Sequence, residues 1–158
     1  MRTRAFSGNI GFVGVGALGS TMARAMHQAG YSVTAVTSRT TASAEQVMME
    51  LDGCKAMQTA QEVADCSDVV LLTVPDNAIE IVANATQWHP DQVVVHCSGA
   101  TPLSMLNPAK NVGALIGAIH PLQTFGTTDG APVVMRGIAY AIESEPPLSE
   151  GLANLATD

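Results

Sequence analysis

Short continuous apolar runs alternate along the chain with stretches in which apolar residues recur every three or four positions. Continuous runs are typical of strands covered on both faces of a sheet, and the spaced pattern is typical of helices with one buried side. The runs predict strands at residues 9–13, 31–36, 55–57, 68–74, 92–97 and 114–120, with a candidate seventh at 137–142. The spaced pattern predicts helices at 18–29, from Thr41 or Ser43 to 51, and at 59–64, 78–88, 102–106 and 148–155.

Local signals mark where some of these elements end. Gly30 should close the first helix, because glycine adopts the left-handed backbone conformation found there. Pro75 should interrupt a strand, Asp76 is predicted to cap the helix that begins at Ala78, and residues 127–132 are predicted to form a loop. The alternation of strands and helices predicts an α/β fold, a doubly wound, mostly parallel sheet with helices on both faces and strand order 3-2-1-4-5-6.

A G-x-G-x-x-G motif, Gly14-Val15-Gly16-Ala17-Leu18-Gly19, joins the first predicted strand to the first predicted helix. In this context the first glycine permits the turn, the second lets a pyrophosphate approach the backbone, and the third lets helix and strand pack closely. Free helix N–H groups then face the phosphates. We therefore predict a dinucleotide cradle formed by Gly14, Gly16, Ala17, Leu18 and Gly19; the alternative is a chance cluster of glycines in a turn.

The end of the second predicted strand indicates which dinucleotide is bound. NAD-binding folds place an Asp or Glu there to hold the ribose 2′-OH, but this chain has no acidic residue between the motif and Glu45. Arg39 can instead pair with a 2′-phosphate, and the hydroxyls of Ser38 and Thr40 can donate to it. These residues predict NADP(H) as the cofactor; the alternative for Arg39 is a solvated surface arginine.

The composition narrows the class of protein. The 158 residues suffice for one domain with a sizeable core. The net charge is −7 and the seven basic residues are scattered, so nucleic acid is not an expected partner. The three cysteines lack disulfide or zinc spacing, which predicts reduced thiols and a cytoplasmic protein. Residues 1–4 imitate the start of a secretion signal, but glycines interrupt the apolar stretch that follows, and no segment could span a membrane.

Ligands of open α/β sheets bind beyond the carboxyl ends of the strands, and three segments reach that edge: 73–77, 96–100 and 120–125. Val74, Pro75 and Ser98 are expected against the cofactor. Ser98 and the Gly99 N–H could bind a substrate carbonyl or carboxylate, and Gln123 could orient a polar substrate. We predict Ser98 and His120 as catalytic residues; His120 could hydrogen-bond the same substrate group or act as an acid near neutral pH.

Other polar residues have structural explanations. A helix cap is the favoured role for Asp76, and His96 is expected to be a satisfied histidine inside a strand. Cys97 either lines the cleft or is a buried structural thiol, the second being favoured. No role is assigned to His27 or His89. The sequence has neither metal-ligand spacing nor a G-x-S-x-G elbow, so no metal site or hydrolase triad is predicted.

Five segments occur in an order that resembles a known family: Gly14–Gly19, Thr37-Ser38-Arg39, Val74-Pro75-Asp76, 96–100 and His120-Pro121-Leu122-Gln123-Thr124-Phe125. Together they resemble the N-terminal NADP-binding domain of Rossmann-like oxidoreductases related to pyrroline-5-carboxylate reductase, the deazaflavin-dependent NADP reductases and the β-hydroxyacid dehydrogenases. The resemblance covers about residues 8–145. It implies a Rossmann sheet, followed by a helical domain that shapes the substrate pocket and mediates homodimerisation.

One family feature has no counterpart here. β-Hydroxyacid dehydrogenases use a lysine on a helix after the Rossmann domain, and neither Lys55 nor Lys110 matches that position. We expect residues 146–158 to begin a helix that leads into a helical domain absent from the chain; the alternative is a complete one-domain protein.

The resulting hypothesis is an NADP(H)-dependent oxidoreductase that transfers hydride to or from a small carbonyl or imine substrate. This chain is expected to form its nucleotide-binding domain and to be inactive if the catalytic group lies elsewhere. The alternatives are a non-catalytic dinucleotide-binding or sensing module, and an interaction module that no longer binds the cofactor.

Overall fold

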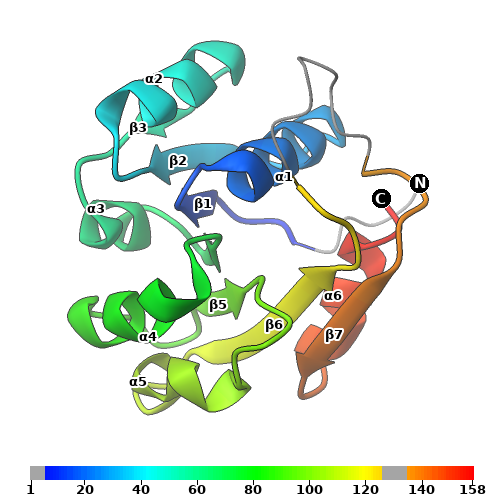
Figure 1. Ribbon diagram of the computed structural model, residues 1–158. Helices are drawn as coiled ribbons and strands as arrows, with labels where there is room; N and C mark the ends of the chain where they lie inside the picture. The colour runs from blue at the N-terminus through cyan, green and yellow to red at the C-terminus, as the bar shows by residue number, and fades with distance from the viewer. Residues whose placement is uncertain (1–5, 126–134) are drawn as a thin grey trace.

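A seven-stranded sheet forms the centre of the computed structural model, which describes residues 6–125 and 135–158 (Figure 1). The strand order is β3-β2-β1-β4-β5-β6-β7, and only β7 is antiparallel to its neighbour. The predicted loop at 127–132 and the basic N-terminus at 1–4 lie outside the described residues. The strands are β1 (Ile10–Val13), β2 (Val33–Thr37), β3 (Lys55–Ala56), β4 (Val69–Leu72), β5 (Val93–His96), β6 (Leu115–Pro121) and β7 (Tyr140–Ser144).

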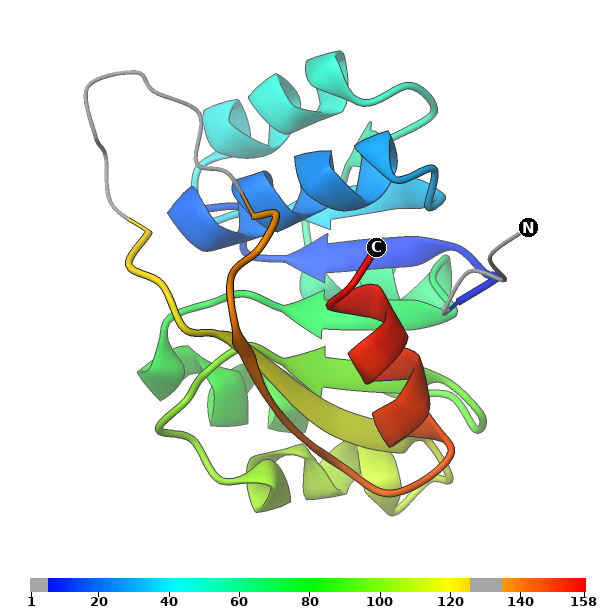
Figure 2. The same ribbon diagram turned by 90° about the vertical axis from the view of Figure 1, so that its right-hand side faces the viewer.

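Helices cover both faces of the sheet, and each face has its own apolar cluster (Figures 1 and 2). On one face lie α1 (Ala17–Gln28), α2 (Thr41–Glu50) and α6 (Leu148–Leu155). The opposite face carries α3 (Ala60–Asp65), α4 (Asp76–Ala85), the 3₁₀ helix η1 (Leu103–Leu106) and α5 (Asn107–Lys110). The predicted fold class is therefore confirmed, because β1, β4 and β5 are buried on both sides as their continuous apolar runs require.

The strand order was predicted correctly as far as β6, and the candidate seventh strand is present with shifted bounds. β7 begins at Tyr140, three residues later than expected, because Gly137 adopts a φ of +81° that no strand residue has. From Tyr140 onward the chain runs antiparallel to β6, with Tyr140 opposite Pro121 and Ser144 opposite Gly117. This edge strand carries α6 back onto the sheet, where Leu148 and Leu152 are buried.

The observed helix ends differ from three of the predictions and confirm one. Gly30 follows α1 with a φ of +85°, as expected, and its N–H donates to the His27 carbonyl at 2.9 Å. Asp76 does not cap α4: Pro75 occupies the cap position and Asp76 is the first helical residue. Thr40, rather than Thr41 or Ser43, is the N-cap residue of α2. The helix predicted to reach residue 88 ends at Ala85, since the chain then turns to bury the indole of residue 88.

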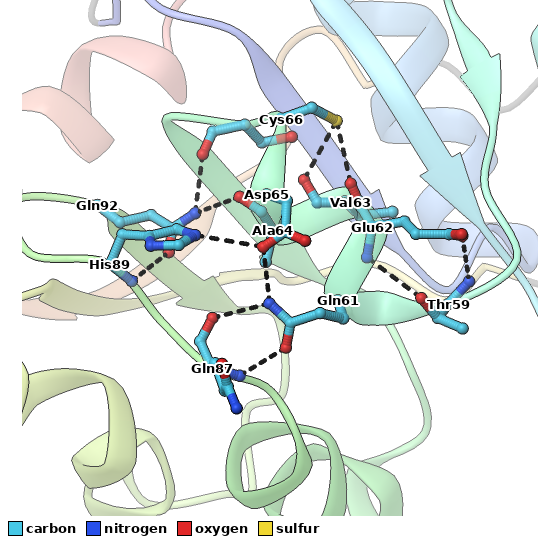
Figure 3. Close-up of polar contacts among 11 residues, drawn as sticks. Thr59, Gln61, Glu62, Val63, Ala64, Asp65, Cys66, Gln87, His89 and Gln92 are labelled. Atoms are coloured by element: carbon cyan, nitrogen blue, oxygen red, sulfur yellow. Dashed lines mark hydrogen bonds and ion pairs between the residues drawn. The ribbon is translucent and has the colours of Figure 1, made fainter.

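A polar network holds the amino ends of β4 and β5 together, at the edge of the sheet opposite the glycine motif (Figure 3). The amide of Gln92 is buried and donates to the carbonyls of Ala64 and Ser67, at 2.8 Å each. Beside it, Gln61 exchanges two hydrogen bonds with the backbone of Gln87. Because these bonds satisfy the polar ends of α3 and of the α4–β5 loop, the network serves the fold and not the candidate site.

Within the described residues, no helix combines the length and the apolar character needed to cross a bilayer.

Candidate functional site

The glycine motif lies at the carboxyl end of β1, where its first glycine makes a turn open only to glycine. Gly14 has a φ of +94°, and its N–H donates to the Thr37 carbonyl at 2.9 Å. A Cβ at this position would lie 2.8 Å from Cγ1 of Val74 and 2.9 Å from the Thr73 carbonyl oxygen. The turn thus brings the ends of β1, β2 and β4 into contact, as the predicted role of the first glycine requires.

The third glycine permits α1 to pack directly on this turn. A Cβ on Gly19 would lie 2.0 Å from the carbonyl oxygen of Gly14 and 2.5 Å from Oγ1 of Thr73. The Thr73 hydroxyl donates to the same carbonyl oxygen. Thr73 therefore fastens the end of β4 to the glycine turn. Sequence reasoning placed Thr73 at this edge but gave it no role.

The second glycine is the open part of the motif. Gly16 is exposed, and a Cβ built on it meets no protein atom within 4 Å. It is the N-cap residue of α1, where no side chain caps the helix and no acidic residue occupies the first turn. Ala17 is exposed and Leu18 half-buried beside it. Bare backbone at an uncapped helix N-terminus fits a phosphate, which the helix N–H groups can bind.

The end of β2 supplies hydroxyl groups and a cation next to this loop. Thr37 is buried, Ser38 is half-buried, and Arg39 and Thr40 are exposed. Oγ1 of Thr40 lies 2.6 Å from Oγ of Ser43. Among the residues that the structure describes, Arg39 has no carboxylate partner. Its charge is therefore available to a ligand such as a phosphate.

The turn after β5 is held by hydrogen bonds to both of its sides. The Ser98 N–H donates to Nδ1 of His96 at 3.2 Å, and Nδ1 of His120 lies 3.1 Å from the Cys97 carbonyl oxygen. Since a carbonyl can only accept, His120 carries its proton on Nδ1 and leaves Nε2 free. Oγ of Ser98 accepts from the N–H groups of Ala100 at 3.2 Å and residue 101 at 3.1 Å. The structure thus brings His120, near the end of β6, against the turn that carries Ser98.

His96 differs from the satisfied histidine that the sequence led us to expect. It is fully buried, and its Nδ1 accepts the Ser98 N–H, but no described group bonds to its Nε2. Burial lowers the pKa of His96, and the nearby carboxylates of Glu143 and Asp76 only partly oppose this effect. The ring is therefore neutral, with its proton on an unpartnered Nε2.

Three of the remaining candidate residues lie at the same edge of the sheet as the glycine motif, and the fourth is buried. Val74 reaches the glycine turn, whereas Pro75 and Gln123 are exposed at the same edge of the sheet. Cys97 is buried against Met22, and burial raises the pKa of its thiol to about 12, so it is the structural thiol that was favoured.

Two histidines were given no role. His27 lies in the last turn of α1, and Nε2 of His89 is 3.3 Å from a carboxylate oxygen of Asp65, far from the glycine motif. In the part of the chain that the structure describes, no three His, Cys, Asp or Glu side chains gather as metal ligands would.

One hollow of the described surface lies away from the glycine motif. It is a groove of about 880 Å³ between α1, the segment before β7 and the end of α6. Its apolar lining includes Met22, Met26, Ile119, Ile138 and Leu155. The groove runs along the side of α1, so it does not serve the phosphate-binding end of that helix.

Comparison with known proteins finds relatives in sequence and in fold. An NADPH-dependent reductive aminase from Aspergillus oryzae is 28% identical over 134 residues, which are 84% of this chain and 40% of that protein. The structure of a 3-hydroxyisobutyrate dehydrogenase from Mycobacterium tuberculosis has a TM-score of 0.77 at 15% identity, over 96% of this chain and 53% of that chain. A pyrroline-5-carboxylate reductase from Coxiella burnetii has a TM-score of 0.72 at 17% identity, over 96% and 57%.

The chain therefore spans about half the length of these proteins. The likeness to the two solved structures confirms the fold that the resemblance implied. A family model described as a Rossmann-like domain matches residues 3–121, which is most of the sequence, and the chain belongs to that family.

Proposed function

We propose that the chain is the NADP(H)-binding domain of an oxidoreductase that reduces, or forms by oxidation, a small carbonyl or imine compound. The observation that carries the proposal is the bare backbone of Gly16 at the uncapped N-terminus of α1. A pyrophosphate needs both features, namely room beside the backbone and unpaired N–H groups. The NADPH-dependent reductive aminase that resembles this chain in sequence supports the choice of cofactor and substrate class.

The preference for NADP(H) rests on the end of β2. Arg39 is exposed and free of carboxylates in the described part of the chain, and the hydroxyls of Ser38 and Thr40 flank it. A guanidinium binds a 2′-phosphate through charge-assisted hydrogen bonds. In this proposal Val74 and Pro75 border the cofactor from the end of β4, and Ser98 contacts it from the turn after β5.

Ser98 and His120 are the proposed catalytic residues. When bound, the nicotinamide ring supplies or accepts the hydride. Both lone pairs of the Ser98 hydroxyl accept backbone N–H groups, so only its proton remains to bind an oxygen or nitrogen of the substrate. Because Nδ1 of His120 donates to the Cys97 carbonyl, Nε2 is the ring atom proposed to exchange a proton with the substrate.

Two measurements test this proposal. Calorimetry should show that the chain binds NADPH and binds NADH more weakly; absence of binding would refute both the enzyme and the sensing alternative. The full-length protein should oxidise NADPH in the presence of 1-pyrroline, or of cyclohexanone with methylamine. Binding without turnover of any carbonyl or imine probe would favour the non-catalytic dinucleotide-binding module.

The proposal extends to the assembly. The apolar groove beside α1 is suited to pack against a helical domain of the kind that the family resemblance implies, and such a domain would also form a homodimer. The relatives are about twice as long as this chain, which supports this view. Light scattering of the full-length protein should give a dimer, and a monomer would refute this part of the proposal.

A further inference from the structure

The unpartnered nitrogen of His96 has a cost that the fold alone does not explain. A buried polar group without a hydrogen bond costs about 1–3 kcal/mol, and such a group in a folded protein calls for a reason. The strand register sets His96 beside Leu72 on β4 and Ala118 on β6, both of which are buried apolar residues. An apolar side chain could pack between these two neighbours without the free-energy cost of an unpaired polar atom.

At this position the imidazole contributes one hydrogen-bond acceptor, Nδ1. Nδ1 of His96 is 3.2 Å from the backbone nitrogen of Ser98, only two residues along the chain. Because the amide can only donate, this bond requires Nδ1 to be bare and Nε2 to carry the proton. The tautomer that leaves Nε2 unsatisfied is therefore the one that holds Ser98.

The same turn is held on its other side by His120. Its Nδ1 donates to the Cys97 carbonyl, while the Ser98 Oγ accepts from the N–H groups of Ala100 and Thr101. The two histidines thus bind the two polar atoms of one peptide group, the link between Cys97 and Ser98: His120 binds its carbonyl oxygen and His96 its N–H. Both of these histidine bonds are to backbone atoms, so the two rings act on the Ser98 hydroxyl only through the backbone that carries it.

We propose that His96 is a positioning residue: its Nδ1 fixes the Ser98 backbone so that the hydroxyl proton is the part of Ser98 presented to the substrate. This inference rests on the proposed function. His96 is fully buried and acts only through Ser98, so it is not itself a catalytic residue.

Two substitutions at residue 96 separate positioning from packing. His96→Leu fills the apolar row and removes the acceptor, whereas His96→Asn keeps an acceptor oxygen near the place of Nδ1. With 1-pyrroline as the probe, His96→Leu should lower kcat on the order of tenfold to a hundredfold, because a misplaced catalytic group costs about that much. The KM for NADPH should change much less than kcat, because Ser98 is only one of the proposed cofactor contacts and the backbone of Gly16 is untouched, and His96→Asn should recover most of kcat. Equal losses in both variants would overturn the proposal.

A double variant tests whether His96 acts through Ser98. Residues that act as one unit are not additive, so His96→Leu combined with Ser98→Ala should be no slower than Ser98→Ala alone. Losses that multiply would mean that His96 has an independent role, and the positioning proposal would then be wrong.

A third experiment needs no substrate. Nitrogen NMR of the chain should show the His96 ring protonated on Nε2, and hydrogen exchange at the Ser98 amide should be slow in the wild type and in His96→Asn but at least about tenfold faster in His96→Leu. Unchanged exchange in His96→Leu would overturn the positioning role. If no probe is reduced by the wild type, the proposed function fails, while this experiment still decides whether His96 holds Ser98.

Discussion

The imidazole of His120 lies directly against the bare Cα of Gly99. A Cβ on Gly99 would be 2.6 Å from Cδ2 of the ring and 2.7 Å from Nε2, both too close for a real contact. The ring is fixed in this place by its hydrogen bond to the Cys97 carbonyl. The glycine is therefore required by a side chain that comes from β6, 21 residues later in the sequence.

The first prediction follows from this contact. Gly99→Ala should push the His120 ring away and lower the free energy of unfolding by about 1–3 kcal/mol, as overpacking commonly does. NADPH oxidation should fall with it, while NADPH affinity should fall much less because the glycine motif is untouched. Urea unfolding, calorimetry and turnover measure the three effects.

A His120→Ala background provides the control for Gly99→Ala. Without the ring, the three atoms nearest to the added methyl group are gone, so the second substitution should cost less than about 0.5 kcal/mol. If Gly99→Ala is equally costly in both backgrounds, the contact with His120 is not the reason for the glycine.

The second prediction separates the two kinds of glycine in the motif. Gly16→Val should abolish NADPH binding, because a branched side chain would occupy the space of the pyrophosphate. Its effect on unfolding should be under about 1 kcal/mol, since Gly16 has a negative φ and no protein atom within reach of a Cβ. Thermal unfolding measured with and without NADPH reports both the stability of the variant and its binding of NADPH.

Gly19→Ala is the matched variant, and its main effect should be on stability and not on the space for the pyrophosphate. Its Cβ would lie 2.0 Å from a backbone oxygen, so the loss of stability should exceed about 3 kcal/mol even without ligand. A stable Gly19→Ala protein, or a Gly16→Val protein that still binds NADPH, would mean that the motif is not the cradle described above.

The third prediction concerns the choice between the two nicotinamide cofactors. Arg39→Ala should weaken NADPH binding by about 1.5–3 kcal/mol, the usual value of hydrogen bonds to charged groups, and leave NADH binding nearly unchanged. Lys55→Ala is the control, because Lys55 is also an exposed cation but lies on β3. Equal losses for NADPH and NADH would refute a contact between Arg39 and the 2′-phosphate.

The parts of the fold that the sequence predicted are those set by local rules. The structural roles of the first and third glycines were assigned correctly, because each role depends on the backbone of neighbouring residues: Gly14 needs a positive φ, and Gly19 needs close contact. The buried strands β1, β4 and β5 were found because a two-sided burial leaves a continuous apolar run.

What the sequence could not give depends on residues distant along the chain. The antiparallel pairing of β7 depends on β6, and the half-exposed pattern of its residues resembles that of a loop. The unpartnered Nε2 of His96 depends on Leu72 and Ala118, two neighbours from other strands. Nor could periodicity show that Thr73 would bond to the carbonyl of Gly14, 59 residues earlier.

The fourth prediction uses the lowered pKa of His96. Because burial holds its pKa in the folded protein below the ordinary value of 6.5, the unfolded chain binds a proton at pH values where the folded chain does not. Stability from this group is fully present above about pH 6.5. It is lost as the pH falls from 6.5 toward the folded pKa, by up to about 1.4 kcal/mol per pH unit.

Comparison with His96→Asn isolates this effect, since asparagine does not titrate and keeps the acceptor for the Ser98 N–H. Urea unfolding between pH 7.5 and pH 5 should show a steeper loss of stability in the wild type than in the variant, and the two curves should run parallel above pH 7. The window stays above the range in which most carboxylates titrate. Parallel curves throughout would mean that His96 takes up a proton as readily in the folded protein as in the unfolded chain, which a neutral ring bonded through a bare Nδ1 does not allow.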